Sequence, residues 1–221
     1  MQKKSISLII FVLLIQTLVF ATDKKKNYFF CKDSTINPLA NFSEEWNKLD
    51  YEKCNTAKDL EYLTATERDV IWIINMVRFN PKLFLNTVLL NPKSPVYKSI
   101  KQRNFYYNSL IENLKTLAPD SSPLMPNTDL FLTAKCHAYE YGKFGYVGHD
   151  RKSNICVKDF YGECCYYGLN DPFDIVISLL IDEKIRDLGH RKIMLSNRYG
   201  LIGVSLQPHI SYGTNTVLDF K

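Results

Sequence analysis

The sequence lacks every short motif that identifies a catalytic centre by itself. Gly-x-Ser-x-Gly, the papain-like cysteine context, His-Glu-x-x-His and a phosphate-cradling glycine loop are all absent. It also has no Cys-x-x-Cys pair, internal repeat or low-complexity tract. No nucleophile can therefore be named, a zinc ribbon or finger is disfavoured, and the catalytic residues are unknown at this level.

Charge of one sign is also scarce. The 221 residues carry a formal net charge of +5, and 46% of them are apolar against 23% charged, a balance that suits a globular domain and excludes a disordered or fibrous chain. Two lysines, Lys3 and Lys4, lie in a segment that we expect to be removed, which leaves 26 basic and 23 acidic side chains, a charge of +3. This excess is too small to indicate nucleic-acid binding.

Residues 1–21 have the pattern of a secretory signal peptide. Lys3 and Lys4 precede an apolar stretch over residues 6–20, and small residues end at Ala21, where we expect cleavage. The alternative is an uncleaved anchor, which is disfavoured because the stretch is shorter than the ~20 residues of a membrane-spanning helix. The prediction is a secreted, extracellular protein with no membrane span in its mature chain.

Six cysteines remain after cleavage, an even number, and disulfides are their default use in an oxidising compartment. They are Cys31, Cys54, Cys136, Cys156, Cys164 and Cys165. Metal ligation is the alternative, and sequence cannot choose among the 15 pairings that six cysteines allow.

Position suggests one pairing and limits the partners of two further cysteines. Cys31 and Cys54 both lie in the polar stretch before the core, where a bond would fix that stretch. Cys164 and Cys165 are neighbours whose side chains point to opposite faces of an extended segment. We expect these two to take different partners from the other pair, residues 136 and 156, or to stay partly free.

The chain divides into three parts. After residues 1–21, residues 22–62 form a polar arm with few periodic apolar positions, and residues 63–221 form the main domain. The arm contains one N-glycosylation sequon at Asn41, which matters where the host glycosylates.

The main domain begins with helical patterns. A capping box at Thr64 opens a helix that stops at Asn80-Pro81, and Pro81 opens a short second helix that reaches Leu90. Helical spacing returns over residues 96–117, a proline-rich loop spans 119–126, and another helix covers about 128–144.

The second half changes character. Residues 145–168 suit strands and loops, a helix starts at Asp171-Pro172, and strands are predicted over 201–206 and 216–220. Helices followed by a mixed helix and hairpin region predict an α+β fold with an antiparallel sheet.

Two histidines and two acids stand out as a candidate site. His149, His190 and Glu163 each follow a glycine, which lets the backbone aim the side chain, and Asp182 precedes His190 by eight residues. Such a set can ligate a divalent metal, do acid–base work, or form a buried polar network, and spacing alone favours the network or a set of unrelated surface residues. Of the other histidines, His137 is expected to be a satisfied helical residue and His209 to be exposed.

These residues resemble the CAP superfamily (cysteine-rich secretory proteins, antigen 5 and pathogenesis-related proteins; the SCP-like extracellular domain), and its microbial branch in particular. The resemblance covers about residues 63–220 and consists of several motifs in order. They are Asn75, Arg78 and Asn80-Pro81; Ala134, Ala138 and Gly148-His149; Gly162-Glu163; Ile181-Asp182; Gly189-His190-Arg191; Ile202-Gly203-Val204; and Val217-Leu218-Asp219-Phe220.

The resemblance implies an α-β-α sandwich with a central sheet. It maps His149, Glu163, Asp182 and His190 onto the family's cleft tetrad, with His149 and His190 as ligands of a divalent metal such as zinc. Asp182 departs from the family in standing where many members have Glu. The family implies extracellular binding of a sterol, a lipid or a protein partner, without a uniform enzymatic activity. The alternatives are a metal-dependent, peptidase-like hydrolase and a tetrad that only stabilises the fold.

Overall fold

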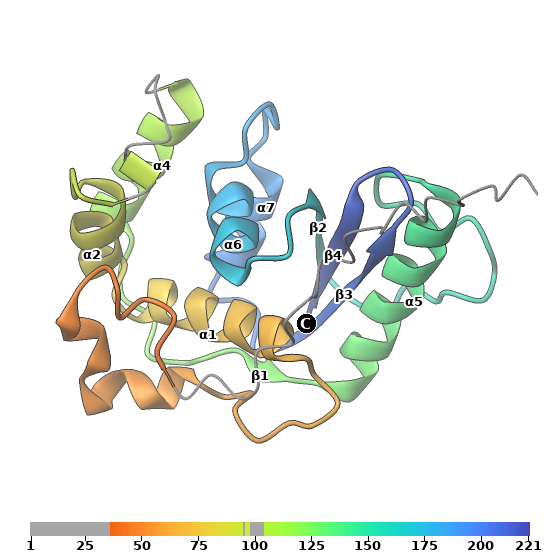
Figure 1. The fold of residues 1–221 in the computed structure, drawn as a ribbon, viewed down its shortest axis with the longest axis horizontal. Helices are drawn as coiled ribbons and strands as arrows, with labels where there is room; N and C mark the ends of the chain where they lie inside the picture. The colour runs from red at the N-terminus through yellow and green to blue at the C-terminus, as the bar shows by residue number, and fades with distance from the viewer. Residues whose placement is uncertain (1–35, 95, 98–103) are drawn as a thin grey trace, which may run out of the picture. The chain divides into compact units, whose positions relative to one another are not determined.

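A four-stranded sheet with helices on both faces forms the centre of the protein (Figure 1). The structure is a computed structural model that describes residues 36–94, 96–97 and 104–221. The predicted signal peptide and Cys31 lie outside this range. Helices and a mixed sheet confirm the α+β fold class.

The sheet has the strand order β1-β3-β4-β2. β2 (Gly162–Gly168), β3 (Leu201–His209) and β4 (Gly213–Phe220) pair antiparallel. β1 (Met125–Pro126) pairs parallel with β3 and falls in the segment predicted to be a loop, so the wholly antiparallel sheet that we expected is corrected to a mixed one. β2 lies at the free edge, which leaves one side of this strand open to other segments.

The helices follow the sequence pattern closely. Their bounds are α1 (Ala65–Phe79), α2 (Pro81–Phe84), the π-helical η3 (Leu85–Leu89), α4 (Phe105–Thr116), α5 (Thr128–Phe144), α6 (Pro172–Ile181) and α7 (Gly189–Met194). Thr64 and Glu67 form the predicted capping box at the start of α1. The sequence pattern does not predict the short α7, which carries His190.

The sheet separates two layers of helices. α5 packs on β3 and β4, whereas α1, α6 and α7 contribute to the main hydrophobic core on the opposite face (Figure 1). The period of two along each strand decides which side chains face which layer. Cys164 joins the main core, while its neighbour Cys165 packs with Ala134 and Ala138 of α5, as the alternation predicts.

The main core extends into the polar arm. The arm contains two 3₁₀ helices, η1 (Glu44–Asn47) and η2 (Leu49–Cys54), and its Trp46 is fully buried in the main core. The amide of Asn75 donates to the Cys54 carbonyl at 3.0 Å and to the Leu124 carbonyl at 3.1 Å. α1 therefore holds the arm and the segment before β1 together. Within the described residues, none of the helices is long and apolar enough to cross a membrane.

Candidate functional site

His149 is held by a buried acid at the edge of the sheet. It lies in the loop after α5, and its Nδ1 is 3.0 Å from Oε1 of Glu163 on β2. The Glu163 side chain is 4% exposed and that of His149 51% exposed. Gly148, just before it, has φ +110°, and its N–H donates to the Tyr167 hydroxyl at 2.9 Å. The glycine and this hydrogen bond fix the loop that presents the imidazole.

His190 is held in the same way from the other layer. Its Nδ1 is 2.7 Å from Oδ1 of Asp182, whose side chain is fully buried. Oδ2 of Asp182 accepts the backbone N–H of His190 at 3.0 Å, so a single carboxylate orients the start of α7 and its imidazole. Asp182 has φ 59° at the C-cap of α6, a left-handed conformation that Asp tolerates better than most residues.

The structure brings the two histidine–acid pairs together. The loop after α5 and helix α7 approach β2 from opposite faces of the sheet, and the ring centroids of His149 and His190 are 5.8 Å apart. The described residues give neither ring a hydrogen-bond partner at Nε2. Two oriented imidazoles therefore lie side by side at the edge of the sheet, that of His149 51% exposed and that of His190 15% exposed.

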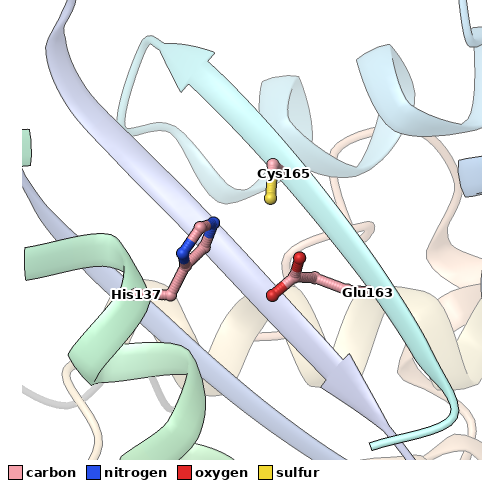
Figure 2. Close-up of side chains that lie close together, drawn as sticks. All are labelled: His137, Glu163 and Cys165. Atoms are coloured by element: carbon pink, nitrogen blue, oxygen red, sulfur yellow. The ribbon is translucent and has the colours of Figure 1, made fainter. Parts of the chain in front are cut away.

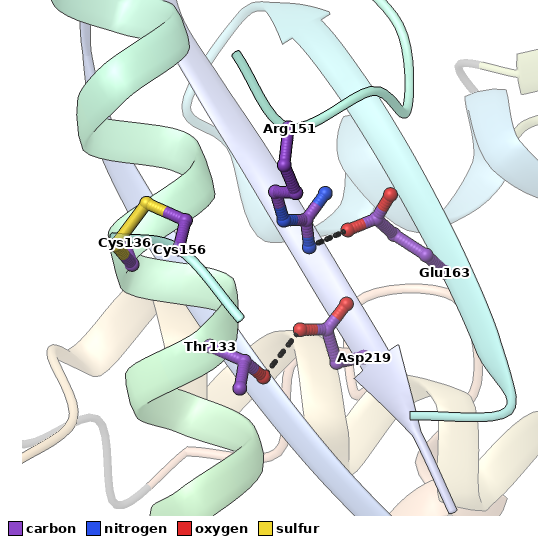
Figure 3. Close-up of a disulfide and its surroundings, with 6 residues drawn as sticks. All are labelled: Thr133, Cys136, Arg151, Cys156, Glu163 and Asp219. Carbon is purple, nitrogen blue, oxygen red and sulfur yellow. Dashed lines mark hydrogen bonds and ion pairs between the residues drawn. A yellow bond between two sulfur atoms is a disulfide. The ribbon is translucent and has the colours of Figure 1, made fainter. Parts of the chain in front are cut away.

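Two charged residues that the sequence does not place in the candidate site join it. Arg151 donates from Nη2 to Oε2 of Glu163 at 2.5 Å, and its side chain is only 7% exposed (Figure 3). Asp219 stands opposite Glu163 in the β2–β4 register, and its Oδ2 accepts the hydroxyl of Thr133 at 2.6 Å (Figure 3). If the register between β2 and β4 had been known, strand alternation would have placed Asp219 on the same face as Glu163. No sequence pattern indicates that Arg151 belongs to the site.

The ionisation of this network follows from burial and hydrogen bonding. Burial alone would raise the pKa of Glu163, but hydrogen bonds from His149 and Arg151 outweigh it and lower this pKa to about 2. Burial raises the pKa of Asp219 to about 8, with the Glu163 charge adding to the effect. At neutral pH the neighbouring acids thus differ in charge: Glu163 is ionised and Asp219 is protonated.

One disulfide joins α5 to the loop beside the site. Cys136 and Cys156 are bonded to each other, so the expectation that they pair with Cys164 or Cys165 is wrong (Figure 3). Cys164 and Cys165 are buried free thiols, which is the alternative outcome. Cys54 is also a free, buried thiol among the described residues.

A second group of potential metal ligands lies deeper under α5. Ligand atoms of His137, Glu163 and Cys165 lie within 4.8 Å of one another, and all three residues are buried (Figure 2). This cluster could hold a metal ion. Nε2 of His137 lies 3.0 Å from the Gly148 carbonyl oxygen, as expected of a satisfied histidine, but its buried Nδ1 has no partner among the described residues.

The structure also places His209, Asn41 of the sequon and Arg191 of the resemblance. His209 is 3% exposed, not exposed as predicted, because its Nε2 contacts the Tyr146 carbonyl at 2.9 Å and its Nδ1 accepts the Ser211 N–H. Asn41 of the sequon is exposed. The guanidinium of Arg191 contacts carbonyls of α6 and the Ser109 hydroxyl, so this residue braces helices.

Comparisons with protein-family models, with curated proteins and with solved structures found no match to this chain. They neither support nor oppose the resemblance to the CAP superfamily. The argument for function therefore depends on the geometry of the site.

Proposed function

We propose that this chain is an exported, CAP-like binding protein that holds a divalent cation, zinc in the first instance, between His149 and His190. The observation that carries the proposal is that each imidazole is fixed through Nδ1 by a buried acid while the other imidazole lies 5.8 Å away. An Nδ1–H bonded to a carboxylate leaves the lone pair on Nε2, and this carboxylate–histidine arrangement is typical of zinc ligands.

The distance between the rings suits a shared ion. With Zn–N bonds of ~2.0–2.1 Å and a tetrahedral angle, two imidazoles on one zinc have ring centroids roughly 5–6 Å apart. The observed 5.8 Å falls in this range. His149 and His190 would supply two nitrogens, and the remaining positions would be open to water or to a ligand. A bound zinc would supply Lewis acidity there.

Export is supported by two independent features. Residues 1–21 have the signal-peptide pattern, and Cys136 and Cys156 form a disulfide, a bond that persists in oxidising compartments. A secreted protein with no recognisable nucleophile fits extracellular binding better than hydrolysis. The hydrolase alternative uses the same residues, with Glu163 or Asp182 activating a metal-bound water.

A patch of exposed apolar side chains at the C-terminal end of α5 suits a sterol or lipid. Its members are Phe144, Tyr146, Val147, Ile210 and Tyr212, each between 41% and 72% exposed. The Phe144 and Tyr146 rings stack with centroids 5.7 Å apart, and the Ile210 N–H donates to the Gly142 carbonyl, which brings the turn between β3 and β4 beside the end of α5. Exposed apolar groups gathered in this way commonly mark a binding surface.

The metal proposal is tested by calorimetric titration of zinc into the mature chain at pH 7. His190→Ala and His149→Ala should each remove a binding event, whereas Asp150→Asn, a change at an exposed acid beside His149, should leave zinc binding unaltered. Zinc binding that is unchanged in His190→Ala would contradict the proposal. Peptidase turnover that a chelator abolishes would favour the hydrolase alternative instead.

The lipid proposal is tested separately with vesicles that contain sterol. Ile210→Asp should weaken co-sedimentation of the protein with the vesicles, because it adds a charge to the apolar patch. Leu49→Asp, a change at a residue that is 79% exposed in the arm, should leave co-sedimentation unchanged. Equal effects of the two variants would mean that the patch is not the lipid-binding surface.

A further inference from the structure

We infer that the buried cluster of His137, Glu163 and Cys165 is a second metal site, which selects a thiophilic divalent ion such as zinc. This inner site differs from the proposed outer site in its nitrogen ligand and in having a sulfur ligand, and Glu163, a ligand here, only orients His149 in the outer site. It goes beyond the proposed function, because it can be present or absent whatever binds between His149 and His190.

The fold places the three ligands by regular secondary structure. Glu163 and Cys165 are two residues apart on β2, so their side chains point to the same face of the sheet. His137 comes from α5, which covers that face, and Figure 2 shows its ring directed toward the two strand residues. Ligand atoms of the three residues lie within 4.8 Å of one another before any ion is added.

The imidazole of His137 is buried beside the thiol and the carboxylate. His137 is fully buried, yet its Nδ1 has no hydrogen-bond partner among the described residues. A buried polar atom in this state costs ~1–3 kcal/mol. The Gly148 carbonyl oxygen contacts both Nε2 of His137, at 3.0 Å, and Sγ of Cys165, at 3.7 Å, so the imidazole and the thiol lie next to each other.

Cys165 is a free thiol whose polar contacts, which include one with the Tyr167 side chain, leave it available as a ligand. Sγ of Cys165 lies 3.7 Å from the Gly148 carbonyl and 3.6 Å from Nδ1 of His149. Binding breaks the S–H bond, releases its proton to solvent and forms a metal–sulfur bond, with no change of oxidation state. Nitrogen, carboxylate and thiolate ligands together suit zinc, and three protein ligands leave one coordination position free.

Arg151 brings a buried positive charge to the cluster but leaves part of the Glu163 carboxylate without a partner. Its Nη2 contacts Oε2, and His149 contacts Oε1, which together use two of the roughly four acceptor positions of a carboxylate. Two acceptor positions remain for an ion. The thiolate of Cys165 adds a negative charge that partly offsets the charge of the metal.

Cobalt(II) titration of the full mature chain tests the inner site, because a thiolate bound to Co(II) produces a near-ultraviolet charge-transfer band. We expect the band in the wild type and its loss in Cys165→Ser, with affinity weakened by more than ~100-fold, the upper end for outer-shell partners. Cys164→Ser is the matched control, because this adjacent thiol faces the other layer and donates to the His190 carbonyl. His190→Ala should also keep the band.

X-ray absorption of the zinc-loaded wild type requires no variant and therefore does not depend on whether Cys165→Ser folds. It should show a sulfur neighbour at ~2.3 Å, with one sulfur per zinc if only the inner site is filled and half a sulfur per zinc on average if both sites are filled. A zinc shell of nitrogen and oxygen alone, or a cobalt band that survives Cys165→Ser, would overturn the inner site. Loss of the band in Cys164→Ser but not in Cys165→Ser would overturn it as well. None of these results decides whether the outer site binds zinc. The calorimetric titration of His190→Ala answers that question separately.

Discussion

Glu163 and Asp219 stand directly opposite each other on β2 and β4, and both acids are buried on the face that α5 covers. Arg151 and His149 satisfy Glu163, whereas Asp219 contacts Thr133 at one oxygen and has no partner at the other among the described residues. The pair keeps a single negative charge because its second member retains a proton.

This pair makes stability depend on pH in a defined direction. The pKa of Asp219 is raised from 3.8 to about 8, so the folded state binds more protons than the unfolded state between these values. Stability therefore falls as pH rises toward 8. Between pH 6.5 and pH 8 the free energy of unfolding of the wild type should fall by on the order of 2 kcal/mol, at about 1.36 kcal/mol per pKa unit. Asp219→Asn should not show this fall. Unfolding in urea at several pH values measures this dependence. If the unfolding free energy of the variant falls with pH as steeply as that of the wild type, Asp219 is not its cause.

The contact of α5 with the sheet depends on a glycine. A Cβ at Gly203 would lie 2.1 Å from the Leu130 carbonyl carbon, in the first turn of α5. Gly203→Ala should destabilise the protein by about 3 kcal/mol or more, since neither backbone can move aside freely. Gly200→Ala is the control, because a Cβ at that position would meet nothing within 4 Å, and it should change the melting temperature little. Equal melting temperatures for the two variants would count against this packing.

Arg78 ties α1 to the segment after α7. Its guanidinium donates to Asp120 at 2.6 Å and to the Ser196 carbonyl at 2.7 Å, and its side chain is 1% exposed. Arg78→Met should cost about 3–5 kcal/mol in the free energy of unfolding, since it leaves a carboxylate and a carbonyl unpaired. Lys115→Met breaks an exposed pair of similar length with Glu112 and should cost under about 1 kcal/mol. Comparable losses of unfolding free energy in the two variants would show that burial does not determine the strength of these ion pairs.

The disulfide should stabilise the fold by restricting the unfolded chain. Cys136 and Cys156 are 20 residues apart, and closing a loop of this size contributes about 3 kcal/mol. Removing both cysteines by substitution with Ser should lower the melting temperature. A reductant should then have little further effect on the variant, while it lowers the melting temperature of the wild type. A wild type that is insensitive to reductant under denaturing conditions would contradict the bond.

Sequence patterns predict most of the secondary structure. The capping box at Thr64 and the Asn80-Pro81 stop define α1, and the expected helix over residues 128–144 coincides with α5. These predictions succeed because local caps and periodic apolar residues determine the helices. β1 is not predicted because two residues that pair with a strand distant in sequence have no local signal. α7 is not predicted because six residues are too few to show a helical period.

The candidate site is only partly accessible from sequence. His149, Glu163, Asp182 and His190 stand out through their glycine contexts and the family resemblance, and the structure brings them together. The inner ligands do not stand out. The sequence favours a satisfied helical residue for His137 and a disulfide for Cys165, because only the packing of α5 on β2 brings them to Glu163.

The central claim is that one ion binds between His149 and His190, and anomalous diffraction from crystals soaked in zinc tests it most directly. The account predicts a zinc peak within bonding distance, ~2.0–2.1 Å, of Nε2 of both rings. Zinc bound elsewhere on the protein, with no peak between these two nitrogens, would contradict it.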